Sequence, residues 1–198
     1  MIGAVVLAAG ASRRFGRSPK MLAPLHGKPL LAHVLAPLAT AGVRCVVLVT
    51  GASRARVARA ARLHAPTSLR LRTVCNAGYR HGKAGSVQQG LGALPRHCDA
   101  ALICLGDMPG LNARLLRRLR AAWQPGLDCV RPVHSGVAGH PVLISRDLFA
   151  PIQALDGDQG ARAVLAHVPP ARRRLIEAGA GSVVDIDTPP ALRAHRRR

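Results

Sequence analysis

Apolar runs alternate along the chain with alanine- and leucine-rich stretches. The short runs predict buried strands, at Ile2–Leu7, Cys45–Thr50, Leu69–Cys75, Ala100–Leu105 and Cys129–Val133. The stretches between them predict helices, at Leu30–Ala41, Ala55–Leu63, Val87–Leu94 and Ala113–Trp123. Further along, we expect strands at Pro141–Ser145 and Ser182–Ile186 and helices at Arg162–His167 and Pro190–Arg196. This alternation predicts an α/β fold, with a mostly parallel sheet flanked by helices and joined by right-handed crossovers.

The chain contains no repeat and no long linker, so residues 1–198 are expected to form a single domain. Whether the basic tail from about residue 194 is ordered stays open. No apolar run approaches the roughly 20 residues of a membrane-spanning helix, and the N-terminus does not resemble a signal peptide. The 5 cysteines form no C-x-x-C pair. They are expected to be reduced core thiols of a cytoplasmic protein with no membrane partner.

The charge is strongly positive, with 29 lysines and arginines against 9 acidic residues and a net charge of +20. Such a charge is typical of nucleic-acid binding, of attraction for anionic small molecules, or of a compositional bias. The cations are spread along the chain, and aromatic residues make up only 2% of it. Since aromatic side chains are the stacking platforms for single strands, no specific nucleic-acid partner is expected.

Glycines, small residues and cations directly follow the first predicted strand. The segment is Leu7-Ala8-Ala9-Gly10-Ala11-Ser12-Arg13-Arg14-Phe15-Gly16, and Lys20 lies four residues on. Glycine lets a backbone approach phosphate oxygens, and successive N–H groups can form an anion-binding nest. Arginine and lysine add charge at the same place. The alternative is a glycine-rich turn with solvated cations. No G-x-x-x-x-G-K-[ST] or G-x-G-x-x-G string occurs here, which disfavours NTPase and dinucleotide-binding chemistry.

Asp107 follows the apolar run Ala100–Leu105 in the string Leu105-Gly106-Asp107-Met108-Pro109. Ligands collect beyond the carboxyl ends of strands in open α/β sheets. A carboxylate at that place suits Mg²⁺, which binds through one or two carboxylates together with substrate phosphates. The alternative is a turn aspartate, or a cap for the helix from Ala113.

A second acidic pair occurs in Val184-Asp185-Ile186-Asp187-Thr188-Pro189. Alternation along a strand would place Asp185 and Asp187 on the same face, where a cation could separate the two charges. Asp187 is slightly favoured over Asp185 as the second metal ligand. Asp187 or Thr188 could equally cap the helix that follows.

Three further segments carry polar residues at expected strand or helix ends. Gly82, Lys83, Gly85 and Ser86 lead into a helix whose N-terminus would favour an anion; a plain capped helix is the alternative. His140 lies between a glycine and a proline before a short strand, where a solvated or structural histidine is equally expected. Asp158 precedes a predicted helix, which it could cap.

Five motifs in order, from Leu7 to Pro189, resemble those of the molybdenum cofactor nucleotidyltransferases of the MobA-like type. They are L-A-A-G-x-S-x-R-x-G with its lysine, a glycine-rich segment at residues 82–86, L-G-D-x-P, G-H-P-V and D-I-D-T-P. Lys83 stands where that family has methionine. The resemblance implies a Rossmann-like fold of glycosyltransferase-A type and Mg²⁺ as cofactor. It implies catalytic roles for Arg14, Lys20 and Asp107, and metal ligation by Asp107 and Asp187.

The resemblance also implies a division of the remaining residues between two substrates. It assigns nucleotide binding to Leu7, Ala8, Ala9, Gly10, Ser12, Gly16, Gly82, Gly85 and Ser86. It assigns acceptor binding to His140 and Asp158.

The reaction implied is transfer of CMP from CTP to the phosphate of a molybdopterin-type acceptor, with release of pyrophosphate. Relatives that use GTP usually carry L-A-G-G, whereas this chain has L-A-A-G. The methyl group of Ala9 removes space beside the base and favours a pyrimidine. Transfer from GTP, or to another phosphorylated small molecule, is the alternative. A non-catalytic factor that delivers the cofactor is another, and a client molybdoenzyme is a candidate partner.

Overall fold

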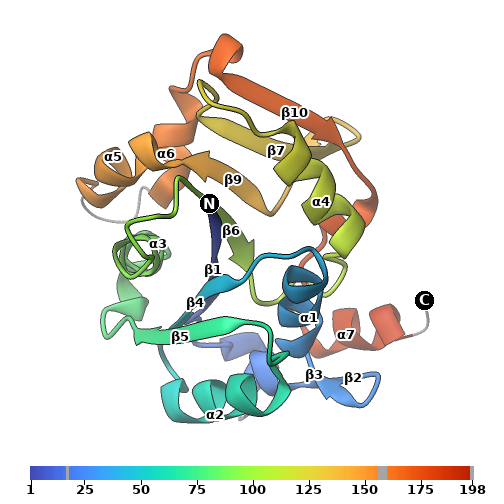
Figure 1. The fold of residues 1–198 in the computed structure, drawn as a ribbon. Coiled ribbons are helices and arrows are strands. Elements are labelled where there is room, and N and C mark those ends of the chain that lie inside the picture. The colour runs from blue at the N-terminus through green and yellow to red at the C-terminus, as the bar shows by residue number, and fades with distance from the viewer. Residues whose placement is uncertain (17, 156–159, 197–198) are drawn as a thin grey trace.

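A mixed, mostly parallel sheet forms the centre of the molecule (Figure 1). The computed structural model describes residues 1–16, 18–155 and 160–196. Over these residues eight strands join in the order β10-β7-β9-β6-β1-β4-β5, with β8 paired to β7. Their bounds are β1 Ile2–Ala8, β4 Cys45–Thr50, β5 Arg70–Cys75, β6 Ala100–Leu105, β7 Cys129–His134, β8 Val137–Ala138, β9 Val142–Ser145 and β10 Arg173–Glu177.

Neighbouring strands β5, β4, β1 and β6 are all parallel, and β10 is parallel to β7. Strand β9 runs antiparallel to both β6 and β7. The register pairs Leu7 with Leu105, and Ala8 with Thr50. The carboxyl ends of β1, β4 and β6 therefore lie side by side, and the amino end of β9 lies at the same edge.

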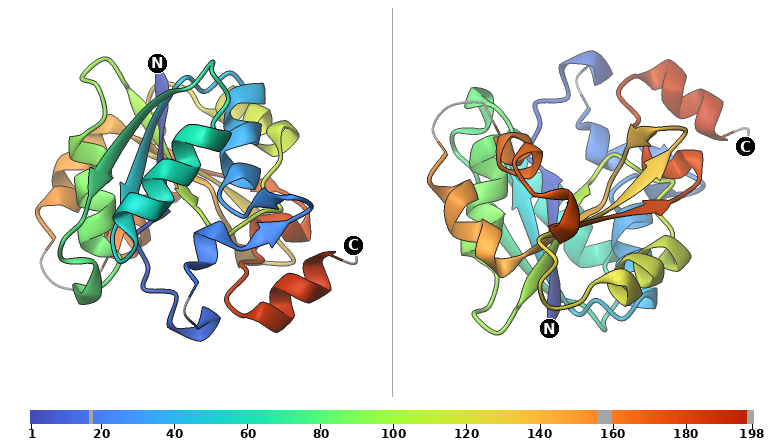
Figure 2. Two further views of the ribbon diagram at one scale, coloured as in Figure 1. Left: turned by 90° about the horizontal axis from the view of Figure 1, so that it is seen from below. Right: turned by 90° about the horizontal axis from the view of Figure 1, so that it is seen from above.

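Seven helices cover the two faces and one end of the sheet in the described part of the chain (Figure 2). They are α1 Ala32–Thr40, α2 Arg54–His64, α3 Ala84–Gly92, α4 Ala113–Ala122, α5 Phe149–Gln153, α6 Gly160–Ala166 and α7 Pro189–Arg196. None of the helices described is long and apolar enough to cross a membrane.

Alternate residues of each strand enter two separate cores. In β1, Ala4 and Val6 pack with α1, α2 and α4, whereas Val5 packs with α3 and α5. Side chains of successive residues point to opposite faces of a strand, so a strand buried on both faces is mostly apolar, as β1 and β6 are, and as β4 is up to its last residue, Thr50. A third, smaller cluster joins the hairpin of β2 (Pro24–Leu25) and β3 (Lys28–Pro29) to α7. The expected α/β fold with a mostly parallel sheet is confirmed.

The strand expected at Ser182–Ile186 is wrong. Residues 180–182 form a 3₁₀ turn, in which the N–H groups of Val183 and Val184 donate to the carbonyl of Ala180. The N–H of Ile186 donates to the carbonyl of Asp107 instead of joining a strand. The alternation of apolar and acidic residues here reflects one buried side chain, Ile186, between exposed neighbours.

The sequence pattern also missed the edge strand β10 and the short helix α5. Strand β10 begins with two arginines, and only Ile176 among its residues is partly buried. Charged, exposed residues are typical of edge strands because they discourage pairing with other chains, but they hide the strand from a search for apolar runs. The basic tail is helical in α7 as far as Arg196, and residues 197–198 lie outside the described range.

Candidate functional site

The loop after β1 turns sharply at the edge of the sheet. The N–H of Gly106 donates to the carbonyl of Leu7 at 2.9 Å, which ties the ends of β1 and β6 together. A side chain at position 106 would come within 3.0 Å of that carbonyl oxygen, so only glycine permits this contact. Further along the loop, Ser12 has φ 53° and its hydroxyl accepts a hydrogen bond from the Lys20 N–H at 3.1 Å. The loop thereby folds back and delivers Lys20 to the end of β6.

Four charged side chains from three segments meet at this point. The Lys20 ammonium donates to Asp107 Oδ2 at 2.6 Å and to Asp187 Oδ1 at 2.8 Å. Arg14 Nη2 donates to Asp187 Oδ2 at 2.7 Å. The Lys20 side chain is 10% exposed and that of Arg14 is 67% exposed. The cluster is thus a row of alternating charges, closed at the Asp107 end and open to solvent at the Arg14 end.

Helix capping does not explain either aspartate. Asn112 caps α4, since its Oδ1 accepts from the Leu115 N–H at 2.9 Å. Thr188 caps α7, since its hydroxyl accepts a hydrogen bond from the Ala191 N–H at 3.3 Å. The carboxylates of Asp107 and Asp187 therefore do not cap these helices, and both accept a hydrogen bond from Lys20.

Burial and the neighbouring carboxylates have opposite effects on the pKa of the Lys20 amine. Burial lowers the pKa of its amine, but the charge of Asp107 and the hydrogen bonds to Asp107 and Asp187 outweigh burial, so the pKa is raised. The hydrogen bond from Lys20 lowers the pKa of Asp187, against a smaller opposing effect of burial. Lys20 and Asp187 are both charged near neutral pH.

Asp107, Asp185 and Asp187 each place one carboxylate oxygen within 4.8 Å of the others. Asp185 and Asp187 come together through an irregular segment rather than through the strand predicted for them. Carboxylate oxygens are the ligands that Mg²⁺ and Mn²⁺ prefer. The residues present therefore fit a divalent cation, which would share Asp107 and Asp187 with Lys20.

A cavity of about 420 Å³ opens beside the charged cluster. Lys20, Asp107, Asp187 and Arg14 all contribute to its wall. So do six of the residues predicted to bind nucleotide, Leu7, Ala9, Gly10, Ser12, Gly82 and Ser86. The other three residues predicted to bind nucleotide do not line this cavity. Ala8 packs in the core, Gly16 lies beyond the bend of the loop with φ 73°, and Gly85 packs against Asn76.

Sequence reasoning missed three residues of this region. Tyr79 and Arg80 line the cavity, and the Arg80 guanidinium lies 5.7 Å from the centre of the Tyr79 ring. Buried Asn76 donates through Nδ2 to the Ser86 hydroxyl at 2.9 Å and fixes that side chain at the start of α3. All three directly follow β5, and Tyr79 is the single tyrosine of the sequence. A search of every strand end would have found them.

A second cavity, of about 820 Å³, adjoins the first and shares Leu7, Gly82, Lys83 and Leu105 with it. His140 lines this second cavity, and its Nδ1 lies 3.4 Å from the Ile103 carbonyl oxygen. Burial lowers the pKa of His140, and nearby Arg131 and Lys83 lower it further, so the imidazole is neutral at pH 7. Asp158, the other residue expected at the acceptor, lies outside the described residues.

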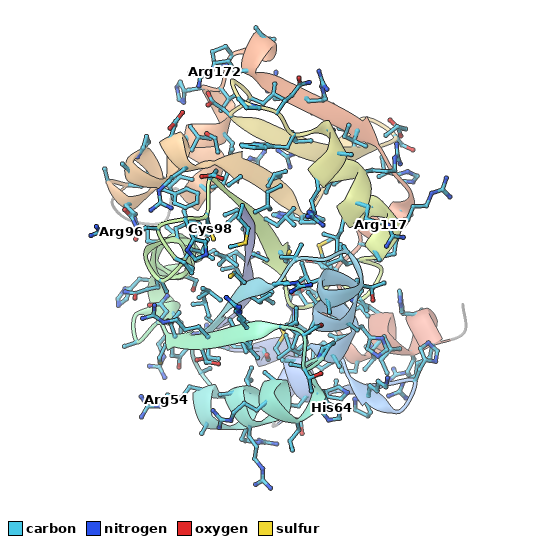
Figure 3. The ribbon with its side chains drawn as sticks, viewed as in Figure 1. Arg54, His64, Arg96, Cys98, Arg117 and Arg172 are labelled. Carbon is cyan, nitrogen blue, oxygen red and sulfur yellow. The ribbon has the colours of Figure 1, made fainter. Side chains whose placement is uncertain are left out.

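The remaining cations do not gather at one place. Figure 3 shows Arg54, Arg96, Arg117 and Arg172 at well-separated points of the periphery. All four are exposed and belong to different parts of the chain. The described surface therefore shows a dispersed positive charge, with a local concentration of cations at the two cavities.

Comparison with known proteins places this site in a family. The model of the MobA-like NTP transferase domain matches residues 4–174. A protein named nicotine blue oxidoreductase, from Paenarthrobacter nicotinovorans, is 32% identical over 175 residues, which are 83% of this chain and 81% of that protein. The bifunctional protein GlmU of Dinoroseobacter shibae is 36% identical over 130 residues, 65% of this chain but only 28% of that protein.

Among solved structures, Rv0371c from Mycobacterium tuberculosis H37Rv superposes with a TM-score of 0.82 at 26% identity, covering 100% of this chain and 98% of that one. A second structure of Rv0371c, a complex with manganese, has a TM-score of 0.78 at 25% identity and covers 99% and 98% of the two chains.

The range matched by the family model contains β1, the loop that follows it, and the carboxylate at the end of β6. The likeness thus includes two of the three segments that build the charged cluster, together with most of the sheet, whereas Asp187 lies beyond the matched range. The chain is a nucleotidyltransferase and belongs to the MobA-like NTP transferase family.

Proposed function

We propose that this protein transfers CMP from CTP to the phosphate of a molybdopterin-type acceptor and releases pyrophosphate. The observation that carries the proposal is the contact of Lys20 with both Asp107 and Asp187 in the wall of the first cavity, which adjoins the second. A nucleotide in the first cavity and an acceptor in the second would meet beside this cluster. The relative from P. nicotinovorans is named an oxidoreductase; the cations and carboxylates at the cavity wall favour phosphate chemistry in this chain.

The chain's own residues position the reactants and neutralise charge. The acceptor phosphate is already an anion, so its oxygen can attack the α-phosphorus of CTP without a general base. The new P–O bond forms as the bond to the bridging α–β oxygen breaks, and that electron pair leaves with pyrophosphate. Lys20 and Arg14 are placed to offset the negative charge on the phosphates, while Ser12 and the loop N–H groups orient them.

Asp107 and Asp187, with Asp185 beside them, are the residues that would hold Mg²⁺. When bound, this cation supplies charge neutralisation at phosphate oxygens. Rv0371c has been solved as a complex with manganese, which supports the proposal that the present protein also binds a divalent cation. The 5 cysteines are all unpaired thiols, which supports a reducing, cytoplasmic location for the protein.

The choice of CTP rests on Ala9. Its side chain is 6% exposed and lines the first cavity at the end of β1. The Ala9 carbonyl accepts from the Ala52 N–H, which fixes the backbone and leaves the methyl group no freedom to withdraw. A methyl group at a cavity wall is typically worth about 1–3 kcal/mol of discrimination, and it would act against the larger purine.

Pyrophosphate release tests the proposal directly. The purified protein is supplied with Mg²⁺, molybdopterin or its molybdenum form, and CTP, GTP or ATP in separate reactions. Release that requires the acceptor and is fastest with CTP is the expected result. Release with GTP alone would overturn the choice of base. No release with any nucleotide would overturn the transferase reaction with this acceptor and favour a delivery factor or a different phosphorylated acceptor.

The variant Lys20→Ala should lower turnover by roughly 10²–10³-fold, since it removes a preorganised charge from the transition state. Lys28→Ala is the matched control, because Lys28 is an exposed lysine of the β2–β3 hairpin, away from both cavities. Circular dichroism and the thermal midpoint establish that both variants are folded. Full activity of folded Lys20→Ala would contradict the role of Lys20.

A further inference from the structure

The described wall of the second cavity combines aliphatic side chains with positively charged ones. Aliphatic side chains from α3, β6, β9 and α6 form most of the lining, among them Val87, Ile103, Val142, Ile144 and Leu165. The polar side chains of the described lining are Lys83, Arg131, His140 and Arg162. Carboxylate, amide and hydroxyl side chains are absent from the described lining. The described part of the wall thus offers apolar surface and positive charge, and little to bind the hydroxyl groups of a sugar.

Arg131 is the most constrained of these cations. It lies on β7 and shares the face of Cys129, which packs in the core beneath α3 and α5. Its Nη2 donates to the Gly139 carbonyl at 3.3 Å, and no described residue accepts a hydrogen bond from its buried Nε. Arg131 lines the cavity, so a ligand that offers an anionic acceptor to its remaining N–H groups would gain affinity.

The groups around Arg131 also favour binding of an anion next to its guanidinium. Burial lowers the pKa of its guanidinium, and the positive charges of Arg162 and Arg173 lower it further. Arginine nevertheless stays charged in proteins. None of the ion pairs found in the described residues involves Arg131 or Arg162. Two guanidinium groups therefore line the same apolar space without an ion pair to any carboxylate of the described residues.

We propose that the second cavity selects an acceptor with an apolar, ring-containing body and an anionic group separate from the phosphate that attacks, and that Arg131 binds that group. The inference rests on the proposed nucleotidyl transfer and specifies its acceptor. Aliphatic walls would cover the faces of the ring, and the guanidinium would bind the anion through N–H groups other than the one that donates to Gly139. A sugar or polyol phosphate would leave several hydroxyl groups without partners, which disfavours it in such a site.

A binding experiment tests this inference without turnover. Naphthalene-1-sulfonate serves as a probe with an apolar ring and one anion, and glucose 1-phosphate serves as a polyol anion. Both are titrated calorimetrically into protein saturated with CTP, so that the first cavity is occupied. We expect the naphthalene probe to bind roughly tenfold or more tightly than glucose 1-phosphate. Absent or weaker binding of the naphthalene probe would overturn the inference.

Variants of Arg131 test the residue itself. Arg131→Gln should weaken binding of the naphthalene probe roughly tenfold or more, while Arg131→Lys should restore part of it through charge alone. The affinity for CTP should stay unchanged in both, which also shows that they are folded. Arg62→Gln is the control, because Arg62 is an exposed arginine on α2. Equal probe affinity in Arg131→Gln and the wild type would overturn the assignment.

Turnover separates this inference from the proposed function. If the wild type transfers CMP, Arg131→Gln should raise the KM of the acceptor and leave the KM of CTP unchanged. An unchanged acceptor KM would overturn the role of Arg131 and leave the reaction intact. Probe binding that depends on Arg131 in a protein that releases no pyrophosphate would instead overturn the reaction and leave the anion site standing.

Discussion

At the scale of single residues, the site depends on a few charged side chains that are held in place by different contacts. Lys20 is held by its backbone, through the bond from its N–H to Ser12, and by its ammonium, through the two carboxylates. Within the described residues, Arg14 pairs with Asp187 alone, and its side chain is mostly exposed. Exposed ion pairs contribute little to stability. Arg14 is therefore suited to moving with a substrate, and Lys20 to staying in place.

The Ala9→Gly variant is expected to relax the choice of nucleotide. Removing a methyl group that lines the first cavity gives a purine more room, so kcat/KM for GTP relative to CTP should rise about tenfold. Steady-state pyrophosphate release with each nucleotide measures the ratio. Ala171→Gly, at an exposed alanine that lines neither cavity, is the control. A ratio that does not change in Ala9→Gly would contradict a steric role for this methyl group.

Asp187 should make stability depend on pH in acid. Its pKa is lowered in the folded protein by the hydrogen bond from Lys20, so it stabilises the fold at pH values above its ordinary pKa of 3.8. This contribution is lost as the pH falls through the lowered value. The thermal midpoint of the wild type, measured from about pH 5 downward, should fall more steeply than that of Asp187→Asn. A constant difference between the two proteins across this range would contradict the ion pair.

At the scale of elements, helix α3 connects the core to the site. Its middle packs on β1 and β4, while its first turn carries Ser86, which Asn76 holds at the cavity. The helix approaches the sheet closely at Gly90, where a Cβ atom would lie only 2.2 Å from Val5 Cγ1. The position of Ser86 is thus set by a contact about one helical turn further along α3.

Gly90→Ala is expected to destabilise the protein by about 1–3 kcal/mol, since overpacking forces the helix away from the sheet. The KM for CTP should rise with it, because Ser86 moves with the helix. Gly92→Ala is the matched control in the same helix, where the nearest atom to a new Cβ is the flexible end of Gln153 at 3.3 Å. Chemical denaturation and steady-state kinetics measure both effects, and equal stability of the two variants would refute the close contact.

The elements that the sequence pattern predicted are those buried on one or both faces. β1, β4 and β6 are almost entirely apolar because helices cover both sides of them, and the ends of β1 and β6 predicted the loops at Lys20 and Asp107. The pattern failed where an element is exposed, as in β10, or where a single apolar residue is buried without a strand, as at Ile186. Tyr79 and Arg131 were missed because their roles arise from tertiary contacts of their segments and not from a local motif.

At the scale of the whole molecule, the positive charge is spread over many parts of the described surface, and the walls of the two cavities carry cations as well. A dispersed charge of +20 attracts anions of every kind through long-range electrostatics. Attraction of that kind is screened by salt over roughly 8–10 Å at physiological ionic strength. Close contacts such as that of Lys20 with Asp107 are much less affected.

Nucleic-acid binding should accordingly be weak, insensitive to sequence and lost with salt. Fluorescence anisotropy with two DNA duplexes of different sequence should give equal affinities at about 50 mM salt. The affinity should fall by orders of magnitude at about 200 mM, as expected when several phosphate contacts are screened. The KM of CTP should rise much less over the same range. More than about tenfold preference for one duplex would contradict this view of the charge.

The position of Asp187 along the chain has a consequence for biosynthesis. It lies 167 residues after Lys20, yet the two side chains are in direct contact. Translation proceeds from the N-terminus, so β1, Lys20 and Asp107 leave the ribosome well before their last partner does. A nascent or prematurely terminated chain that stops before residue 187 lacks the carboxylate that joins Lys20 to Arg14. Partly synthesised copies of the protein are thereby kept from completing the charged cluster, whatever else of the sheet has already folded.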